Sequence, residues 1–190
     1  MKTKFFALLL LVCWMNGFGQ TMETLKLQTQ KMYKASVELN METIMDLTYP
    51  KVFDIVDRET LTKAMAGVFD NETMKVTFTN LNPAFTYSDI KEVDGKKFNV
   101  IRYNNAMKMT LKGEHDEATI AQMKDGLEGS GKFKRIDYDA ASKSFLLEGP
   151  AVMIAVADDT TKKEWTFVNY DDEQLFSMIF DEKIKTALGL

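Results

Sequence analysis

The sequence predicts an α+β fold in which N-terminal helices pack on one curved antiparallel sheet. Apolar residues recur at helical spacing through the first third of residues 20–190, and the period changes to two after Asp70-Asn71. Asp94-Gly95 lies between two extended runs, which is the strongest short-range hairpin signal in the chain. Helices that precede a meandering set of strands are typical of α+β domains, so we expect one such domain over residues 20–190.

Residues 1–19 have the pattern of a secretory signal peptide. A basic start with Lys2 and Lys4 precedes an apolar run from Phe5 to Trp14, and small residues lead to Gly19. The run is about half as long as the roughly 20 residues that cross a bilayer, and no later run replaces it. We therefore expect cleavage between Gly19 and Gln20, export to the periplasm or the exterior, and no transmembrane segment.

Charge and cysteine content narrow the partners that the mature chain can have. The whole chain carries 24 basic and 28 acidic residues, and loss of Lys2 and Lys4 changes the net charge from −4 to −6. An acidic chain without a dense cationic face argues against nucleic-acid binding. Cys13 is the only cysteine and lies in the apolar run, so a cleaved chain has no disulfide and depends on burial for its stability.

Four helical segments are expected in the first third, at residues 22–38, 41–47, 50–56 and from Asp57 to Phe69. Asn40 and Asp57 are good N-caps, because their side-chain oxygens can accept a hydrogen bond from the first helical turn. Pro50 disfavours a helical Tyr49 and suits the first turn of the helix that follows.

Extended segments are expected at residues 74–79, 85–93, 97–111, 133–138, 144–147, 151–157 and 165–170. Alternation over residues 97–111 predicts one buried face, which includes Ile101 and Asn105, and one polar face, which includes Arg102 and Lys108. Gly149-Pro150 predicts a turn between the fifth and sixth strands. Helical spacing predicts an inserted helix over residues 114–129 and a C-terminal helix over residues 172–188.

A group of weak motifs carries a family resemblance. The segment Asp46-Leu-Thr-Tyr-Pro-Lys-Val52 lies between two predicted helices, a late strand contains Trp165, and the chain ends near Leu175-Phe-Ser-Met-Ile-Phe-Asp181. In these features and in element order, the chain resembles the nuclear-transport-factor-2-like (cystatin-like cone) superfamily, above all its small secreted members in Bacteroidetes-type bacteria. The resemblance implies a curved sheet and helices around a pocket, while the insertion at residues 114–129 departs from the plain cone.

The cone fold implies a pocket lined by seven residues: Tyr49, Phe53, Tyr103, Asn105, Met107, Trp165 and Phe167. Methionine and aromatic side chains form adaptable apolar walls. Asn105 is the odd polar group on the predicted buried face, and a buried amide needs a partner from the backbone, water or a ligand. The alternative is that these residues are ordinary core and that Asn105 bonds a neighbour.

The residues that could carry catalysis or bind metal are few. His115 is the only histidine and lies in an acidic turn, which suggests a surface position rather than a general acid–base. A zinc site needs several imidazole or thiolate ligands, and the acidic clusters lack the spacing of a calcium loop. We therefore expect no metal and no cofactor. The surface carboxylates are expected to cap helices and close hairpins.

Three functional hypotheses remain open from the sequence. The first is a non-enzymatic exported domain that binds a small, largely apolar ligand or a partner protein. The second is an isomerase, hydrolase or dehydratase of the cone type, with Asp46 or Asp54 as the carboxylate and Tyr49 or Tyr103 as a hydrogen-bond donor. The third is a structural module that forms a homodimer through its sheet.

Overall fold

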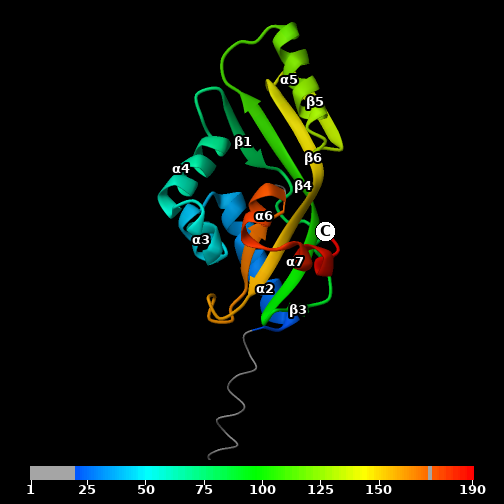
Figure 1. Cartoon of the computed structure of the whole chain (residues 1–190). Coiled ribbons are helices and arrows are strands. Elements are labelled where there is room, and N and C mark those ends of the chain that lie inside the picture. Colours follow the sequence, from blue (N-terminus) through cyan, green and yellow to red (C-terminus); the bar gives the residue numbers. More distant parts are fainter. Residues whose placement is uncertain (1–19, 171–172) are drawn as a thin grey trace, which may run out of the picture.

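The computed structural model describes residues 20–170 and 173–190, and it confirms the predicted α+β class. Within these residues, six α-helices surround a seven-stranded antiparallel sheet that curves but does not close (Figure 1). The predicted signal peptide lies outside the described residues, as do Asp171 and Asp172, where the predicted C-terminal helix was to begin.

The first third is helical, as predicted, and comprises α2 (Met22–Glu38), α3 (Met41–Leu47), the 3₁₀ helix η2 (Pro50–Asp54) and α4 (Arg58–Phe69). The Asn40 side chain accepts a hydrogen bond from the Thr43 amide at 3.1 Å. Asp57 accepts from the Thr60 amide at 2.9 Å, so both predicted N-caps are confirmed. Pro50 occupies the start of η2, where its missing N–H costs no helical hydrogen bond.

The sheet comprises β1 (Met74–Phe78), β2 (Thr86–Tyr87), β3 (Lys91–Val93), β4 (Lys96–Leu111), β5 (Arg135–Asp139), β6 (Ser144–Ala157) and β7 (Thr166–Asn169). Its main order is β1-β4-β6-β5, with β2 and β3 also on β4 and β7 also on β6. The long strands β4 and β6 pair from Lys97↔Ala157 to Thr110↔Ser144 and form the central ribbon of the molecule (Figure 1).

The predicted strand over residues 85–93 is wrong in one respect, because it divides into β2 and β3. Ser88 interrupts the ladder between them. Its hydroxyl accepts a hydrogen bond from the Val100 amide at 2.9 Å, in place of a backbone carbonyl. The Ser88 amide still donates to the Val100 carbonyl at 3.0 Å, whereas the Ser88 carbonyl accepts from the Asn99 side chain at 2.5 Å. Side-chain bonds therefore replace one of the two backbone bonds at this point.

The predicted turn at Gly149-Pro150 is also wrong, because β6 continues through both residues. The Glu148 carbonyl accepts from Lys134 on one side of β6, and the Val152 carbonyl accepts from Tyr170 further along the same side. Alternation places Pro150 on that side as well, in the gap between β5 and β7 where no strand pairs with β6. The missing N–H of Pro150 therefore interrupts no ladder.

The remaining helices lie along different parts of the central ribbon, with α5 at one end and α6 and α7 beside the other half (Figure 1). The inserted helix α5 (Glu117–Gly129) confirms the predicted insertion and begins three residues later than expected, after the N-cap Asp116. The predicted C-terminal helix is instead two helices, α6 (Glu173–Ile179) and α7 (Glu182–Leu188). The Asp181 side chain accepts from the Ile184 amide at 3.0 Å and so caps α7, which separates it from α6.

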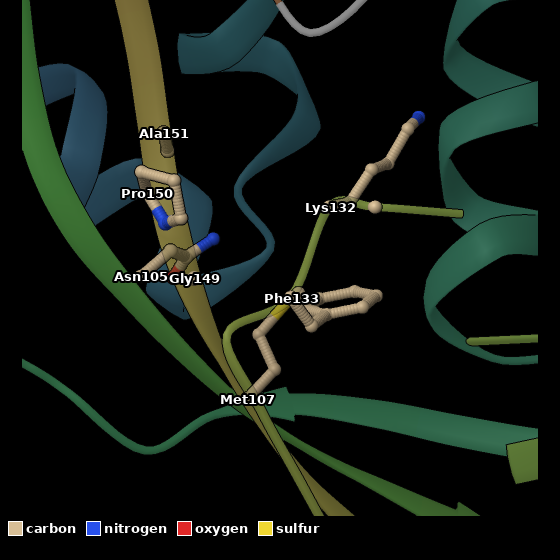
Figure 2. A pocket seen from close by; sticks show the side chains of 8 residues that line it. Asn105, Met107, Lys132, Phe133, Gly149, Pro150 and Ala151 are labelled. Carbon is tan, nitrogen blue, oxygen red and sulfur yellow. The ribbon is translucent and has the colours of Figure 1, made fainter. Parts of the chain in front are cut away.

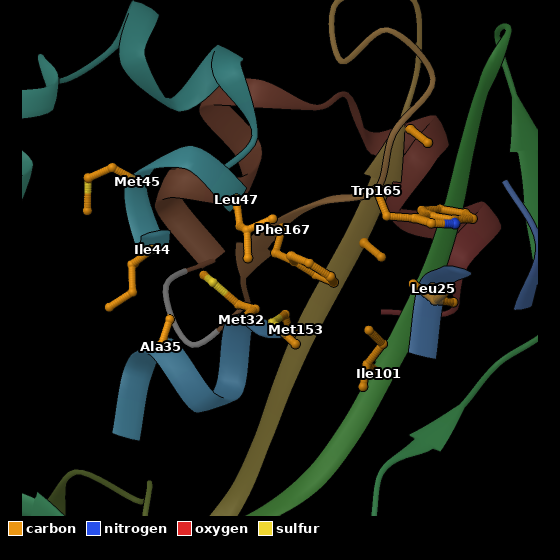
Figure 3. Close-up of a cluster of buried hydrophobic side chains, with 12 residues drawn as sticks. Leu25, Met32, Ala35, Ile44, Met45, Leu47, Ile101, Met153, Trp165 and Phe167 are labelled. Carbon is orange, nitrogen blue, oxygen red and sulfur yellow. The ribbon is translucent and has the colours of Figure 1, made fainter. Parts of the chain in front are cut away.

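Both faces of the sheet are buried near the C-terminal helices. On one face Ile101, Met153, Trp165 and Phe167 pack against α2 and α3 (Figure 3). On the other face a second cluster joins β4, β6 and β7 to the C-terminal helices and includes Phe98, Ile154, Phe176, Phe180 and Ile184. The polar face begins at Arg102, the first residue that the sequence assigns to it, and α6 and α7 cover the earlier part of β4.

Candidate ligand-binding cavity

A cavity of about 340 Å³ lies along the central ribbon, where the segment after α5 passes over β4 and β6. Figure 2 shows Asn105, Gly149 and Pro150 on one side of it and Lys132 and Phe133 on the other. Eight residues line it: Asn105, Met107, Gly131, Lys132, Phe133, Gly149, Pro150 and Ala151. Its walls are mostly apolar, with the amide of Asn105 as the main polar group from the sheet.

The glycine at position 149 determines where the covering segment lies. Gly149 pairs with Asn105 across the ribbon, and a Cβ at this position would overlap the carbonyl oxygen of Lys132. The Lys134 amide then donates to the Glu148 carbonyl at 2.7 Å and anchors the segment to the edge of β6. The absence of a side chain at Gly149 thus allows close approach of the backbone and forms one wall of the cavity.

The side chain of Asn105 has an unmet hydrogen-bonding requirement. Its Oδ1 atom is buried and makes no hydrogen bond within the described residues. Leaving a buried polar group without a partner costs about 1–3 kcal/mol, which a ligand could recover by bonding it. A carboxamide offers both a donor and an acceptor, so rotation of the group presents either one to a ligand.

The structure brings only two of the seven predicted pocket residues, Asn105 and Met107, into this cavity. Tyr49, Trp165 and Phe167 are each about 1% exposed and belong to the core. Phe53 is partly buried, and the Arg58 guanidinium lies 5.9 Å from its ring centroid. Tyr103 is partly buried and packs edge-on against Tyr33. Side chains thus fill the expected space beneath the N-terminal helices, and the cavity lies further along the ribbon.

Sequence reasoning missed the other half of the cavity, which comprises the covering segment from Gly131 to Phe133 and the stretch from Gly149 to Ala151. The available signal was Gly149-Pro150, which we interpreted as a turn. A glycine followed by proline between two β-rich runs is equally consistent with close backbone approach beside an unpaired edge. The two interpretations differ only in what passes over the strand, which local sequence does not specify.

Tyr49 takes part in a buried polar contact rather than in the cavity. Its hydroxyl donates to Oδ2 of Asp158 at 2.7 Å, and Asp158 is 6% exposed. Burial and this carboxylate together raise the pKa of Tyr49 well above its ordinary value. Burial alone would raise the pKa of Asp158, but hydrogen bonds from Thr160, Tyr49 and the Thr161 amide outweigh it and hold the pKa below the usual range.

The geometry around Asp158 indicates a structural function for this buried carboxylate. Its Oδ1 accepts from the Thr160 and Thr161 amides at 2.9 and 3.1 Å and so organises the loop between β6 and β7. The Tyr49 amide also donates to the Phe167 carbonyl at 3.0 Å, which ties η2 to β7. These bonds close the hairpin loop between β6 and β7.

The carboxylates considered for catalysis lie on the surface of the helical region. Asp46 pairs with Arg58 at 2.5 Å and Asp54 with Lys51 at 2.9 Å, and all four side chains are largely exposed. His115 is one of the residues that line a different cavity, beside α5, and its Nε2 is 3.0 Å from the Lys112 carbonyl. Across residues 20–170 and 173–190, no group of three or more His, Cys, Asp or Glu side chains could hold a metal ion.

In the part of the chain that the structure describes, no helix has the length and apolar character needed to cross a bilayer. Comparisons with protein-family models, with curated proteins and with solved structures find no match to this chain. The fold class therefore follows from the structure itself, and the resemblance to the nuclear-transport-factor-2-like superfamily stays a prediction from sequence.

Proposed function

We propose that this protein is an exported binding protein whose cavity at Asn105 takes a small, largely apolar ligand with one polar group. The observation that carries the proposal is the buried Oδ1 atom of Asn105. This atom has no hydrogen-bond partner within the described residues, and Asn105 lines the cavity from β4. Ligand sites commonly combine apolar walls with a few polar groups that orient the ligand. Met107, Phe133 and Ala151 supply such walls here.

The enzymatic alternative has less support from the arrangement of titratable groups. The eight residues around the cavity include no Asp, Glu or His, and the Lys132 side chain is exposed and turned away from Asn105 in Figure 2. Proton transfer needs an acid or base within hydrogen-bond reach of the substrate. Asp46 and Asp54 are exposed and paired with cations, so neither has the buried environment that tunes a catalytic carboxylate.

Thermal unfolding in the presence of small amphipathic compounds tests the binding proposal. A ligand at 100 times its Kd stabilises the folded state by about 2.7 kcal/mol, which raises the Tm of a chain this size by roughly 5–10 °C. We expect such a compound to lose at least tenfold in affinity for the Asn105→Leu variant. An equal shift in that variant, or no active compound in a broad library, would contradict the proposal.

Asn104→Leu is the matched control for this experiment. Asn104 is the neighbouring residue on β4, points to the opposite face and is exposed. The same substitution there changes the amide content and hydrophobicity of the chain without touching the cavity. Ligand affinity should be retained in Asn104→Leu, and loss of binding in both variants would point to a general change in the strand.

Export is the second part of the proposal and rests on the pattern of residues 1–19. We expect the protein recovered from the exported fraction to begin at Gln20, as measured by intact mass and N-terminal sequencing. Cys13 would then be absent, so dithiothreitol should leave the Tm unchanged. Retention of residues 1–19, or a lower Tm under reducing conditions, would overturn the export proposal and leave the binding proposal intact.

A further inference from the structure

Another cavity, of about 280 Å³, lies between α5 and the sheet near the end of the central ribbon. It is lined by Thr73, Met74, Met109, Leu111, Met123, Gly126 and Leu127, so three of its seven lining residues are methionines. They come from three separate elements: Met74 from β1, Met109 from β4 and Met123 from α5.

The register of β1 on β4 brings the first two methionines together. Met74 pairs with Leu111 and Val76 pairs with Met109, so Met74 and Met109 are diagonal neighbours on one face. Diagonal neighbours of an antiparallel pair lie within reach of long side chains. Met123 belongs to the same apolar cluster and approaches from α5, which packs over this face. The fold therefore places three methionines from three elements around one cavity.

The chemistry of these side chains selects the ligand. Thioether sulfur is a neutral, polarisable donor that prefers soft ions such as Cu(I), whereas Ca²⁺ and Mg²⁺ need oxygen ligands and zinc is held by imidazole, thiolate or carboxylate. We propose that Met74, Met109 and Met123 form a binding site for a soft monovalent metal ion of the Cu(I) or Ag(I) class.

The electrostatic surroundings also favour a cation. Met123, Gly126 and Leu127 lie in the last two turns of α5, whose C-terminal end carries a partial negative charge. No basic residue occupies the last turn of this helix. Lys124, one turn earlier, is paired with Glu128 at 3.7 Å. Lys112, beside the Thr73 end of the cavity, is paired with Asp70 at 2.5 Å. Met74 and Met123 are only partly buried, which leaves the ion a path to the sulfur atoms.

Titration with Ag⁺ in chloride-free buffer tests the site, with methionine methyl NMR as the readout. We expect saturation at one equivalent of Ag⁺, with shifts in the methyl resonances of Met74, Met109 and Met123. The methyl resonance of Met107, which lines the cavity at Asn105, should not shift. The same titration with Zn²⁺ should cause no shift, and equal binding of Zn²⁺ would overturn the proposal.

The variant series replaces methionine with leucine, which conserves volume and removes the sulfur. We expect a 100-fold or greater loss of Ag⁺ affinity in the triple variant Met74→Leu/Met109→Leu/Met123→Leu, with an unchanged circular dichroism spectrum. Met178→Leu is the control, because Met178 is 59% exposed on α6. Undiminished Ag⁺ affinity in the triple variant would overturn the proposed site. If the triple variant unfolds, the single variant Met109→Leu should bind Ag⁺ about tenfold more weakly than the wild type. Unchanged Ag⁺ affinity in that single variant would also overturn the proposal.

Discussion

Replacement of Trp165 by alanine is expected to lower the free energy of unfolding by about 3–5 kcal/mol, the largest single effect that we expect in this protein. Trp165 is 1% exposed and packs in the cluster that joins the sheet to α2 and α3 (Figure 3). Its loss removes a large apolar surface from the core and leaves a cavity that the neighbouring strands can close only in part.

Urea unfolding followed by circular dichroism measures this effect. Fluorescence is unsuitable for the variant, because Trp165 is the only tryptophan outside residues 1–19. Leu27→Ala serves as the control, since Leu27 is 60% exposed on α2 and its truncation should change the free energy of unfolding by no more than about 0.5 kcal/mol. A change of that small size in Trp165→Ala would show that the ring does not support the core.

Trp165→Phe separates apolar burial from the indole N–H. The Nε1 atom of Trp165 is buried and has no hydrogen-bond partner within the described residues. Phenylalanine keeps most of the ring surface and removes this unpaired donor, so the substitution should cost clearly less than Trp165→Ala. A cost equal to that of alanine would mean that the phenyl ring does not occupy the site.

Asp158→Ala is expected to lower the free energy of unfolding by about 3 kcal/mol, the second largest effect that we expect. The substitution leaves the buried Tyr49 hydroxyl without its acceptor and releases the Thr160 and Thr161 amides that Asp158 holds. Hydrogen bonds to a buried charged group contribute more than neutral ones, and donors that lose their acceptor add a desolvation cost. Chemical denaturation at neutral pH measures the difference.

Asp159→Ala is the matched control for this prediction, because the next residue has the same side chain in a different environment. Its side chain is 95% exposed and forms only a loose ion pair with Lys163 at 3.9 Å. Its truncation should change the free energy of unfolding by no more than about 0.5 kcal/mol. Equal costs for the two variants would contradict a specific function of the buried carboxylate.

The contribution of Asp158 to the free energy of unfolding should also decrease at acid pH. The pKa of Asp158 in the folded state is held below its ordinary value of 3.8, so its ionised form stabilises the fold above that pH. The stabilisation is lost as the pH falls through the lower, folded-state pKa. The difference in the free energy of unfolding between wild type and Asp158→Ala should therefore be constant from pH 5 to pH 7 and shrink below about pH 4. If the difference in the free energy of unfolding grew at acid pH, the pKa of Asp158 would be raised in the folded state and not lowered.

Periodicity and capping residues predicted most of the fold. The helices at the start of the chain, the hairpin at Asp94-Gly95 and the inserted helix all occur where the sequence places them. Each depends on interactions between residues a few positions apart, such as the Asp57 side chain and the Thr60 amide. Such local preferences can be predicted from a single sequence, because the interacting residues are only a few positions apart in the chain.

The candidate site was less predictable, for a reason that particular residues make clear. Asn105 and Met107 could be assigned to the buried face of β4 by alternation alone. Tyr49, Trp165 and Phe167 have the same apolar character, yet they lie in the core, because α2, α3 and the C-terminal helices cover them. Apolar character predicts burial, but whether a buried side chain meets protein or an open cavity depends on what packs against it.

The sequence by itself determined the α+β class, the limits of most elements and the face of β4 on which Asn105 lies. Only the tertiary structure decided that β6 continues through Gly149-Pro150, that α6 and α7 cover the sheet beside Phe98, and that the segment at Lys132 passes over Gly149. The difference is physical: local hydrogen bonds and periodicity act between neighbours in the chain, whereas cavities arise where residues distant in sequence pack against one another without filling the space.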